Sequence, residues 1–527
     1  MKQNDEYTVK IEKLSNLGTG IAKIDGQVIF VENVCPQDEV KIKIIKANKN
    51  YATAIPIEII IPSEHRIVPF CPMQKVCGSC QLQFIDYEYQ LELKRQMVED
   101  AIRKIGGLDV PINFPLASPD TKEFRHKVQY PVSQTKVSKK ILAGYYKPQS
   151  HEIVNIKYCP IQPEICDEII DFVRENAPKF AISGFNEKKH VGDLRHVVIR
   201  ISATNNDCLV TLVINGTKMF DRLKNFANFI FDNFEKVKGV CVNFNSKKTN
   251  VILGKETECV VGKDFIEENL LDKTFKIGAD TFFQVNPKSA ENIFKYVKNE
   301  VSKIEKPTVL DAYAGIATFG ICVSDVAEKV TSVEENSSSI QKAKEVLKSN
   351  NIENVELFAQ DTLRYLKSIK KKFDIIILDP PRKGCTQEVL DEVLRHLKSN
   401  HSKAESDEIL RSAQNDAIAE GASKGKIIYV SCNPATLARD LRFLCDNGYE
   451  LKKVCGVDQF PQTVHVETVI LLSRKAPDAE IKVRLDMSEL DITSAESKAT
   501  YKEIQEYVKN KYDLHVTNST FPADTFE

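Results

Sequence analysis

The sequence predicts a multidomain α/β protein in which a small β-barrel precedes a mixed α+β region and an open sheet covered by helices. Three observations predict this. The 527 residues exceed what one core holds and fit about three or four domains. Short apolar runs at 7–12, 26–31 and 39–46 are separated by glycine turns, as in a small barrel. From residue 308 onward, buried strands alternate with helical segments.

These changes of pattern also predict the domain boundaries. We expect an OB-like β-barrel at 1–62, an α+β domain at 63–275, a Rossmann-like domain at 276–475 and an accessory extension at 476–527. Within the Rossmann-like domain, small and polar residues at 399–424 interrupt a helix-to-strand connection, which predicts an inserted loop. The sequence assigns no role to the insert or to the extension.

Composition narrows the choice of partners and compartment. Lys and Arg number 73 against 74 Asp and Glu, so nucleic-acid binding would need local basic patches. The first residues lack the apolar core of a signal peptide, and no apolar run approaches the roughly 18 residues that span a bilayer. We therefore expect a cytoplasmic protein without membrane contact. In that compartment, 14 cysteines indicate metal binding, catalysis or burial in place of disulfides.

The predicted barrel carries cations beside an aromatic side chain. Lys41, Lys43, Lys46 and Lys49 occupy outward strand or turn positions, and Tyr51 follows them. This arrangement is typical of barrels that bind single-stranded nucleic acid. A solvated strand face would have the same pattern, and these residues alone leave both interpretations open.

A cysteine cluster opens the second domain. Cys71, Cys77 and Cys80 lie within ten residues of turn-forming sequence, and Gly78 permits the tight turn that brings two thiolates to one metal. Cys159 is the expected fourth ligand, because the proline after it repeats the Cys71-Pro pattern; Cys166 is the alternative. Four thiolates suit zinc or a 4Fe-4S cluster, and the spacing does not decide between them.

Basic residues alternate with apolar ones on two later strand-like runs of the same domain. Arg125 and Lys127 lie on the first run, and Arg195 and Arg200 lie on the second. Each strand could bury one face and present cations to RNA phosphates on the other. Solvated strand faces remain the alternative.

The third domain begins with a nucleoside-binding pattern. The buried strand that starts at Thr308 opens into a turn of small residues and then a helix, and the next strand ends at Glu334. A carboxylate at that position can accept hydrogen bonds from both ribose hydroxyls. A dinucleotide site would need three spaced glycines for the pyrophosphate, but this turn contains Gly315 alone. S-adenosylmethionine, which has no phosphate, fits the turn better.

Three further residues combine reactive side chains with strand ends or strand interiors. Asp379 ends a buried strand and is followed by two prolines that fix the backbone at the ligand edge. Cys432 ends another strand, which makes its thiol a candidate nucleophile, although free cysteines are more often buried as small hydrophobes. Glu467 lies within an apolar run, where a carboxylate is costly unless it has a function or a salt-bridge partner.

The motifs together resemble the RNA uracil-5-methyltransferases, most closely those that act on 23S ribosomal RNA and carry a TRAM domain and a 4Fe-4S cluster. The resemblance spans residues 7–475 and rests on the four cysteines, Phe282-Phe-Gln-Val-Asn, the Asp311 turn, Asp379-Pro-Pro-Arg, Ser431-Cys-Asn-Pro and His465-Val-Glu-Thr. It departs from the family at Ala314 and Ala317, where cysteine and glycine are frequent. We expect this change to weaken cofactor affinity at most and to leave the chemistry unchanged.

The resemblance implies a role for each residue. It implies that Cys71, Cys77, Cys80 and Cys159 bind the cluster, and that Gln284, Tyr313, Glu334 and Asp379 contact S-adenosylmethionine, with Asp361 near the adenine. It implies that Cys432 adds to carbon 6 of uracil and that Glu467 removes the proton from carbon 5. The implied partner is RNA, most closely 23S rRNA, bound by a monomer.

Three rival functions share parts of these motifs. The same chemistry could act on tRNA. A radical enzyme would usually carry C-x-x-x-C-x-x-C, whereas this chain has five residues between its first two cysteines. A non-catalytic RNA-binding iron-sulfur protein would be expected to lack Cys432 or Glu467, and both are present.

Overall fold

The computed structural model describes residues 1–398 and 425–475. The predicted insert at 399–424 and the extension at 476–527 lie outside the described residues. Contacts within the chain group Met1–Arg474 as one unit. Among the described residues, no helix combines the length and the apolar character needed to cross a bilayer.

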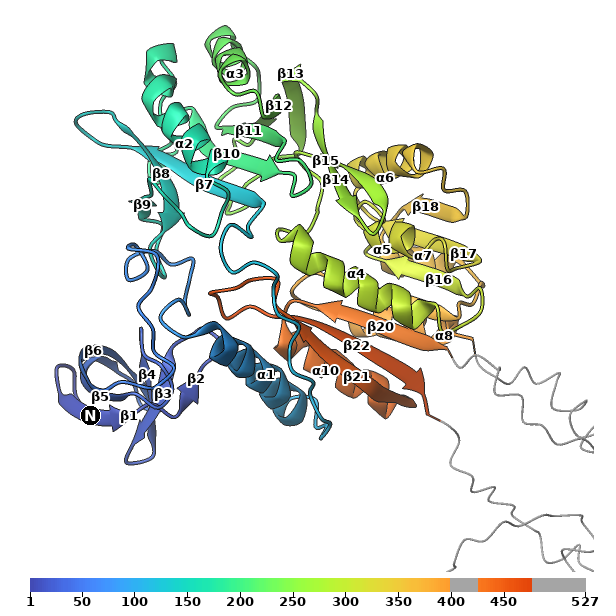
Figure 1. Cartoon of the computed structure of the whole chain (residues 1–527), viewed down its shortest axis with the longest axis horizontal. Helices are drawn as coiled ribbons and strands as arrows, with labels where there is room; N and C mark the ends of the chain where they lie inside the picture. Colours follow the sequence, from blue (N-terminus) through green and yellow to red (C-terminus); the bar gives the residue numbers. More distant parts are fainter. Residues whose placement is uncertain (399–424, 476–527) are drawn as a thin grey trace, which may run out of the picture. The chain divides into compact units, whose positions relative to one another are not determined.

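The N-terminal region forms a six-stranded sheet with the order β1-β5-β6-β4-β3-β2 (Figure 1). Along β5, Val40, Ile42 and Ile44 are fully buried, whereas the residues between them are partly exposed. This alternation gives the region its own apolar core. The shortest of these strands is β2, which has two residues. The strands are β1 (Glu6–Lys10), β2 (Lys13–Leu14), β3 (Gly20–Ile24), β4 (Gln27–Val31), β5 (Glu39–Ala47) and β6 (Tyr51–Ile61).

A second, seven-stranded sheet has the order β13-β12-β11-β10-β7-β8-β9. Apolar residues of helices α2 and α3, such as Ile170 and Phe226, pack with Val128, Val197 and Val210 in one core on one face of this sheet. The strands are β7 (Lys127–Gln134), β8 (Ile141–Tyr146), β9 (Ile153–Asn155), β10 (Leu194–Ile201), β11 (Cys208–Ile214), β12 (Val237–Phe244) and β13 (Glu256–Gly262). The helices are α2 (Ile165–Asn176), the 3-10 helix η1 (Ala177–Phe180) and α3 (Asp221–Asn233).

The C-terminal sheet has the order β18-β17-β16-β19-β20-β22-β21, and only the pairings of β22 are antiparallel. Strand order reverses between β16 and β19, which is the position where open α/β sheets bind ligands. The strands are β16 (Thr308–Ala312), β17 (Lys329–Glu334), β18 (Val355–Ala359), β19 (Ile375–Leu378), β20 (Lys426–Ser431), β21 (Tyr449–Val457) and β22 (Glu467–Arg474). A hairpin of β14 (Phe265–Leu270) and β15 (Lys273–Gly278) precedes this sheet.

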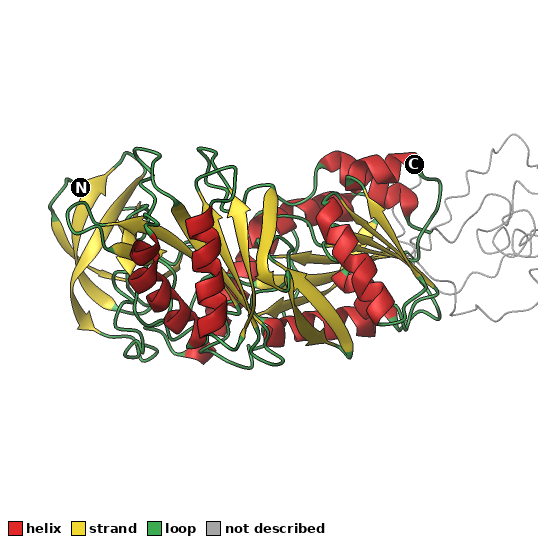
Figure 2. Cartoon of the chain, turned by 90° about the horizontal axis from the view of Figure 1, so that it is seen from above, coloured by secondary structure: helices red, strands yellow, loops and turns green. Residues whose placement is uncertain are grey.

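Helices cover both faces of the C-terminal sheet (Figure 2). Helices α4 (Pro287–Val301), α5 (Thr318–Cys322) and α6 (Ser337–Ser349) share a core with Val309 and Ile377. Helices α7 (Thr362–Ser368), α8 (Gln387–His396) and α10 (Pro434–Asp446) share the opposite core with Leu310 and Ile376. Helix α1 (Tyr87–Lys104) joins this second core, because its Val98 and Ile102 pack there and the helix contacts α10. A helix that follows the cysteine cluster in sequence thus packs against the C-terminal sheet.

Candidate active site

Three predicted site residues meet at one edge of the C-terminal sheet. Asp379 follows β19 and Cys432 follows β20; these strands pair in parallel, with Leu378 opposite Tyr429. The carboxyl ends of parallel strands lie at the same edge of a sheet. Glu467 is the first residue of β22, which pairs antiparallel with β20. It therefore lies at the edge of the sheet where β20 ends. The sheet therefore brings the thiol and the two carboxylates together.

Burial and the neighbouring charges shift the pKa values of all three groups. Burial raises the pKa of Glu467 to about 8, and the Asp379 carboxylate adds to this shift. Burial raises the pKa of Asp379 to about 7, with a contribution from Asp311. Burial and then Glu467 raise the pKa of the Cys432 thiol to about 11. The site therefore places a thiol beside two carboxyl groups whose pKa values lie close to neutral pH. A thiol can add to carbon as a nucleophile, and such carboxyl groups can transfer protons.

Arg382 is the cation of this site, and the sequence analysis assigned it no role. Its guanidinium lowers the pKa of the Cys432 thiol and also that of Glu467. Helix α10 holds the Arg382 backbone, since Asn433 Nδ2 and Thr436 Oγ1 donate to its carbonyl oxygen at 3.3 and 3.1 Å. A nearby guanidinium favours the thiolate, so Arg382 opposes the effect of burial on the nucleophile.

A buried carboxylate in α10 fixes the loop that carries Arg382. Asp440 is 1% exposed, and one of its oxygens accepts hydrogen bonds from the Cys385 amide at 2.9 Å and the Tyr429 hydroxyl at 2.7 Å. Arg439 pairs with the other oxygen at 2.7 Å. At Gly384 (φ +74°) a Cβ atom would lie 2.6 Å from Asp440, so the close approach requires glycine. The loop and the helix behind Cys432 therefore form one fixed unit.

The loop that leads to Glu467 is anchored to α1 by two buried contacts. Lys94 donates to Asp458 at 2.7 Å, and both side chains are fully buried. Two hydrogen bonds of 3.0 Å join Gln90 and Gln462: Gln90 Nε2 donates to Gln462 Oε1, and the Gln462 backbone N–H donates to Gln90 Oε1. These partners are separated by more than 360 residues, and no local sequence signal joins them. Their effect is to fix Asp458 and Gln462 in the loop that precedes β22.

The predicted nucleoside turn has an unusual backbone. Tyr313, Gly315 and Ala317 all have positive φ values of 58–63°. Glu334 ends β17 and accepts a hydrogen bond from the Gly315 amide at 3.0 Å, so the carboxylate lies against the turn. Ala317 adopts a conformation that favours glycine, which is the residue frequent there in the family that the sequence resembles.

A buried carboxylate oxygen near this turn has no partner. One oxygen of Asp311 accepts from the Gly320 amide at 2.9 Å and the Ser332 hydroxyl at 3.1 Å. The other oxygen is buried without a hydrogen bond in the described structure. An unpaired buried polar atom is costly, so this oxygen can receive a donor from a ligand. Gln284 is partly exposed on the segment between β15 and α4, close in sequence to Phe282, whose side chain is 59% exposed.

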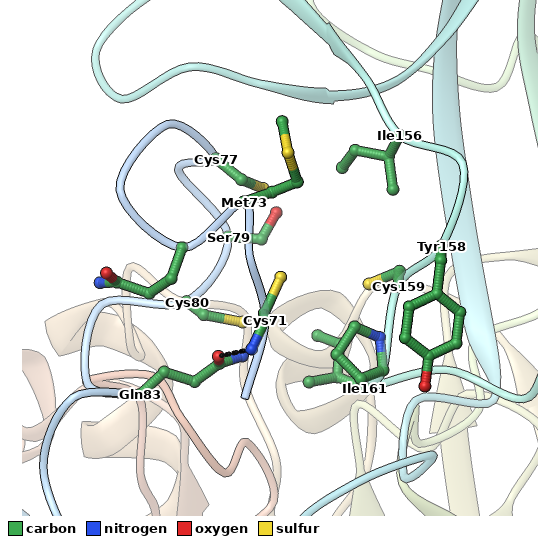
Figure 3. A pocket seen from close by; sticks show the side chains of 12 residues that line it. Cys71, Met73, Cys77, Ser79, Cys80, Gln83, Ile156, Tyr158, Cys159 and Ile161 are labelled. Atoms are coloured by element: carbon green, nitrogen blue, oxygen red, sulfur yellow. Dashed lines mark hydrogen bonds between the residues drawn. The ribbon is translucent and has the colours of Figure 1, made fainter. Parts of the chain in front are cut away.

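The four predicted ligand cysteines line one cavity (Figure 3). Cys71, Cys77 and Cys80 reach it from one loop, and Cys159 reaches it from the opposite side. Cys166 does not line it and is buried in the core of the seven-stranded sheet. The sulfur atoms do not form a closed ligand set: within residues 1–398 and 425–475, no three Cys, His, Asp or Glu side chains are placed to hold a metal ion.

Three protein-family models match parts of the chain. The TRAM domain model matches residues 2–57, the model for conserved hypothetical protein 95 matches 287–422, and that for tRNA (uracil-5-)-methyltransferase matches 414–475. RNA methyltransferases from Clostridium tetani and Clostridium acetobutylicum, both described as uncharacterized, are 36% and 37% identical to the chain. Each alignment covers 90% of this chain and 97% or 98% of the relative. The chain belongs to the RNA uracil-5-methyltransferase family.

A solved structure of this family has the same fold. It is the Pyrococcus abyssi tRNA (uracil-54, C5)-methyltransferase in complex with S-adenosyl-L-homocysteine, with a TM-score of 0.66 and 26% identity. The match covers 88% of this chain and all of that one. For this uracil-5-methyltransferase the findings confirm three predictions: an OB-like TRAM domain, a C-terminal methyltransferase fold and an S-adenosylmethionine-dependent enzyme that acts on RNA.

Proposed function

We propose that the protein methylates carbon 5 of uridine in 23S rRNA through a covalent adduct between Cys432 and carbon 6 of the base, with Glu467 as the base that removes the carbon 5 proton. The observation that supports this is the convergence of Cys432, Asp379, Glu467 and Arg382 at the edge of the sheet where open α/β folds bind ligands.

The first step is addition of the thiolate. Carbon 5 of uracil is a weak nucleophile, and addition of sulfur at carbon 6 converts the ring into an enolate that is reactive at carbon 5. The Cys432 thiol loses its proton to the Asp379–Glu467 carboxylate pair, whose raised pKa values suit that transfer near neutral pH. Arg382 stabilises the thiolate and the charge of the enolate.

The later steps restore the ring. S-adenosylmethionine, when bound, supplies a methyl group on a positively charged sulfur. Carbon 5 then carries both the methyl group and its original proton. Glu467 accepts that proton, the electron pair re-forms the bond between carbons 5 and 6, and Cys432 leaves as a thiolate. Over the whole cycle the Asp379–Glu467 pair accepts one proton from the Cys432 thiol and one from carbon 5. One of them returns to the departing Cys432 thiolate, and the other is released to solvent.

The residues proposed for the cofactor are Gln284, Tyr313, Glu334 and Asp379. Glu334 lies against the Gly315 turn and remains partly exposed, which leaves its carboxylate able to accept ribose hydroxyls. The unpaired oxygen of Asp311 can accept the ammonium group of the methionine part. The donor set therefore fits S-adenosylmethionine.

We propose that Cys71, Cys77, Cys80 and Cys159 hold a 4Fe-4S cluster. Their convergence on one cavity supports the proposal, and four cysteine ligands would leave no iron open to substrate. The cluster would be structural. Zinc is the alternative for the same thiolates.

RNA that contains 5-fluorouridine tests the covalent step. Fluorine at carbon 5 cannot leave as a proton, so we expect the purified protein to stop at a methylated adduct that survives denaturing gel electrophoresis. Cys432→Ser should form none, while Cys445→Ser, which changes a thiol within α10, should trap RNA like the unaltered protein. A Cys432→Ser protein that still traps RNA would exclude this cysteine as the nucleophile.

A deletion strain identifies the target RNA. Mass mapping of its 23S rRNA should show at least one uridine that has lost its 5-methyl group. Loss of the methyl group from tRNA alone would favour the second candidate, which the Pyrococcus abyssi tRNA methyltransferase suggests. If every RNA keeps its 5-methyluridines and the protein still binds RNA, the protein is a non-catalytic RNA-binding protein.

A further inference from the structure

Two cations face each other across neighbouring strands of the seven-stranded sheet. Lys127 on β7 lies directly opposite Arg200 on β10 in the antiparallel register. The Arg125 side chain adjoins them, because its Nε donates to the Lys127 carbonyl oxygen at 3.2 Å. Like charges at directly opposed positions destabilise a sheet. This cationic group, Arg125, Lys127 and Arg200, therefore opposes folding unless something compensates for it.

The described part of the chain supplies little compensation. No described carboxylate pairs with Lys127, and burial followed by Arg200 and Arg125 lowers the pKa of Lys127 to about 7. Arg200 is 3% exposed; it donates to the Thr281 carbonyl, and its Nε is buried without a partner. Asp280 is the acidic side chain that acts on Arg200, and it also accepts a hydrogen bond from Ser338 at 2.9 Å.

Two other cations in the described part of the chain pair closely with buried carboxylates. Lys94 bonds to Asp458 at 2.7 Å, and Arg66 bonds to Asp38 at 2.5 Å. Arg195 shows a second solution, since it donates to the carbonyl oxygens of Asn245 and Lys247 at 2.6 and 2.8 Å. Arg195 is thus committed to the fold and is not free for phosphate. Within the cationic group, Arg200 also donates to a backbone carbonyl, and Arg125 lies over the Tyr145 ring. Lys127 differs, because no described carboxylate or carbonyl oxygen accepts a hydrogen bond from its ammonium group.

The cationic group adjoins the catalytic edge. Arg200 bonds to Thr281 at the start of the segment that carries Gln284, and the His126 amide donates to Val285 in the same segment at 2.7 Å. Burial lowers the pKa of His465, two residues before Glu467, and the charges of Arg382, Lys94 and Arg125 lower it further. An anion held by these cations would therefore lie beside the bound nucleotide.

We propose that Arg125 and Lys127, which are partly exposed, bind a backbone phosphate of the RNA next to the uridine that is methylated, while the buried Arg200 behind them adds positive charge. The inference rests on the proposed function, since it takes RNA as the substrate of this site. A phosphate supplies the missing negative charge and accepts charge-assisted hydrogen bonds from guanidinium and ammonium groups. The carboxylate of S-adenosylmethionine is the other anion that could reach this position, and the test separates the two.

Lys127→Met removes the charge and keeps the length of the side chain. With the full-length protein and a uridine dodecamer as probe, we expect affinity to fall roughly tenfold, as for loss of one charged hydrogen bond. The slope of log K against log salt should decrease by about 0.7. Affinity for S-adenosylmethionine, measured by calorimetry, should not change. Lys136→Met removes an exposed lysine of the β7–β8 loop and should leave the dodecamer affinity within about twofold of the unaltered protein's.

Thermal unfolding gives an independent measurement. Without RNA, Lys127→Met should raise the melting temperature, because it removes a like charge from opposite Arg200. Unchanged dodecamer affinity and salt slope would overturn the inference, and so would a loss confined to S-adenosylmethionine. Failure of the proposed function is distinct: the unaltered protein would then transfer no methyl group to RNA, whatever its affinity for the dodecamer.

Discussion

The two cysteine sites of this protein place the same side chain in opposite surroundings. Cys432 is a single thiol between two carboxylates and the Arg382 guanidinium, at the end of a strand. Cys71, Cys77, Cys80 and Cys159 gather around one cavity, and the Arg125 guanidinium acts on two of them, Cys80 and Cys159. Burial raises the pKa of Cys432 to about 11 and that of Cys159 to about 12.

Burial therefore does not distinguish a nucleophile from a proposed ligand. The neighbours do. Beside Cys432, groups that can take and return protons make reversible addition of the thiolate possible. Around Cys80, the neighbours that act most strongly after burial are further thiols, Cys159 and Cys77, which suits a metal that binds them deprotonated. The comparison predicts that each site can be disabled while the other continues to work.

The largest expected effect is at the nucleophile site. Glu467→Gln should lower turnover by about 10²- to 10⁴-fold, because no base removes the carbon 5 proton. Addition and methyl transfer precede that step, so the variant should accumulate a covalent complex with ordinary RNA on denaturing gels. Its metal content should be normal. Glu450→Gln on β21 is the matched control, and equal turnover in both variants would contradict the assignment.

The ligand site should respond only to its own cysteines. Cys159→Ala should lose most of the bound metal, whereas Cys166→Ala, which alters a thiol buried away from the cavity, should retain it. Iron and acid-labile sulfide are measured after anaerobic purification. Zinc without sulfide would replace the cluster proposal, and equal metal content in both variants would show that Cys159 is not a ligand.

A smaller effect is expected at the anchor between α1 and the loop before Glu467. Lys94→Met leaves Asp458 buried without its cation, so the free energy of unfolding should fall by about 3–5 kcal/mol. Lys13→Ala breaks an exposed pair with Asp100 and should cost under about 1 kcal/mol. Urea titrations measure both. Similar losses in the two variants would show that the buried pair does not fix the loop.

The smallest effect is a shift in the pH profile. Glu467 must be deprotonated to act, so kcat/KM should rise as the pH increases through about 8. Asp379 raises that pKa by its negative charge, and Asp379→Asn should therefore move the rising limb to lower pH while also reducing activity. Asp446→Asn, an exposed change at the end of α10, should leave the limb in place. A limb that moves to higher pH in Asp379→Asn would contradict this coupling.

The sequence located the reactive groups because strand ends are a local pattern. Asp379 and Cys432 each follow an apolar run, and parallel strands bring such ends to one edge. Arg382 directly follows the two prolines after Asp379, which fix its position, but its role does not follow from that motif. Its effect on the thiol depends on the approach of α10, which the spacing of residues does not reveal.

Contacts between distant segments could not be predicted in this way. Lys94 lies in a polar-looking stretch of α1, and its burial depends on Asp458, which is 364 residues away. The alternation of charged and apolar residues on the basic strands also does not reveal which cations can bind phosphate. Arg195 and Lys127 have the same sequence pattern, yet Arg195 is bonded to backbone carbonyls and Lys127 has no such partner.

The packing of α1 has a consequence for how the chain can be divided. A fragment that starts at residue 276 would contain every strand of the C-terminal sheet but would lack Val98, Ile102 and Lys94. Apolar side chains that these residues cover would face water, and Asp458 would remain inside without its counter-charge. We therefore expect that the C-terminal sheet does not fold stably without α1. Gene fusions or truncations should preserve residues 82–104 together with it.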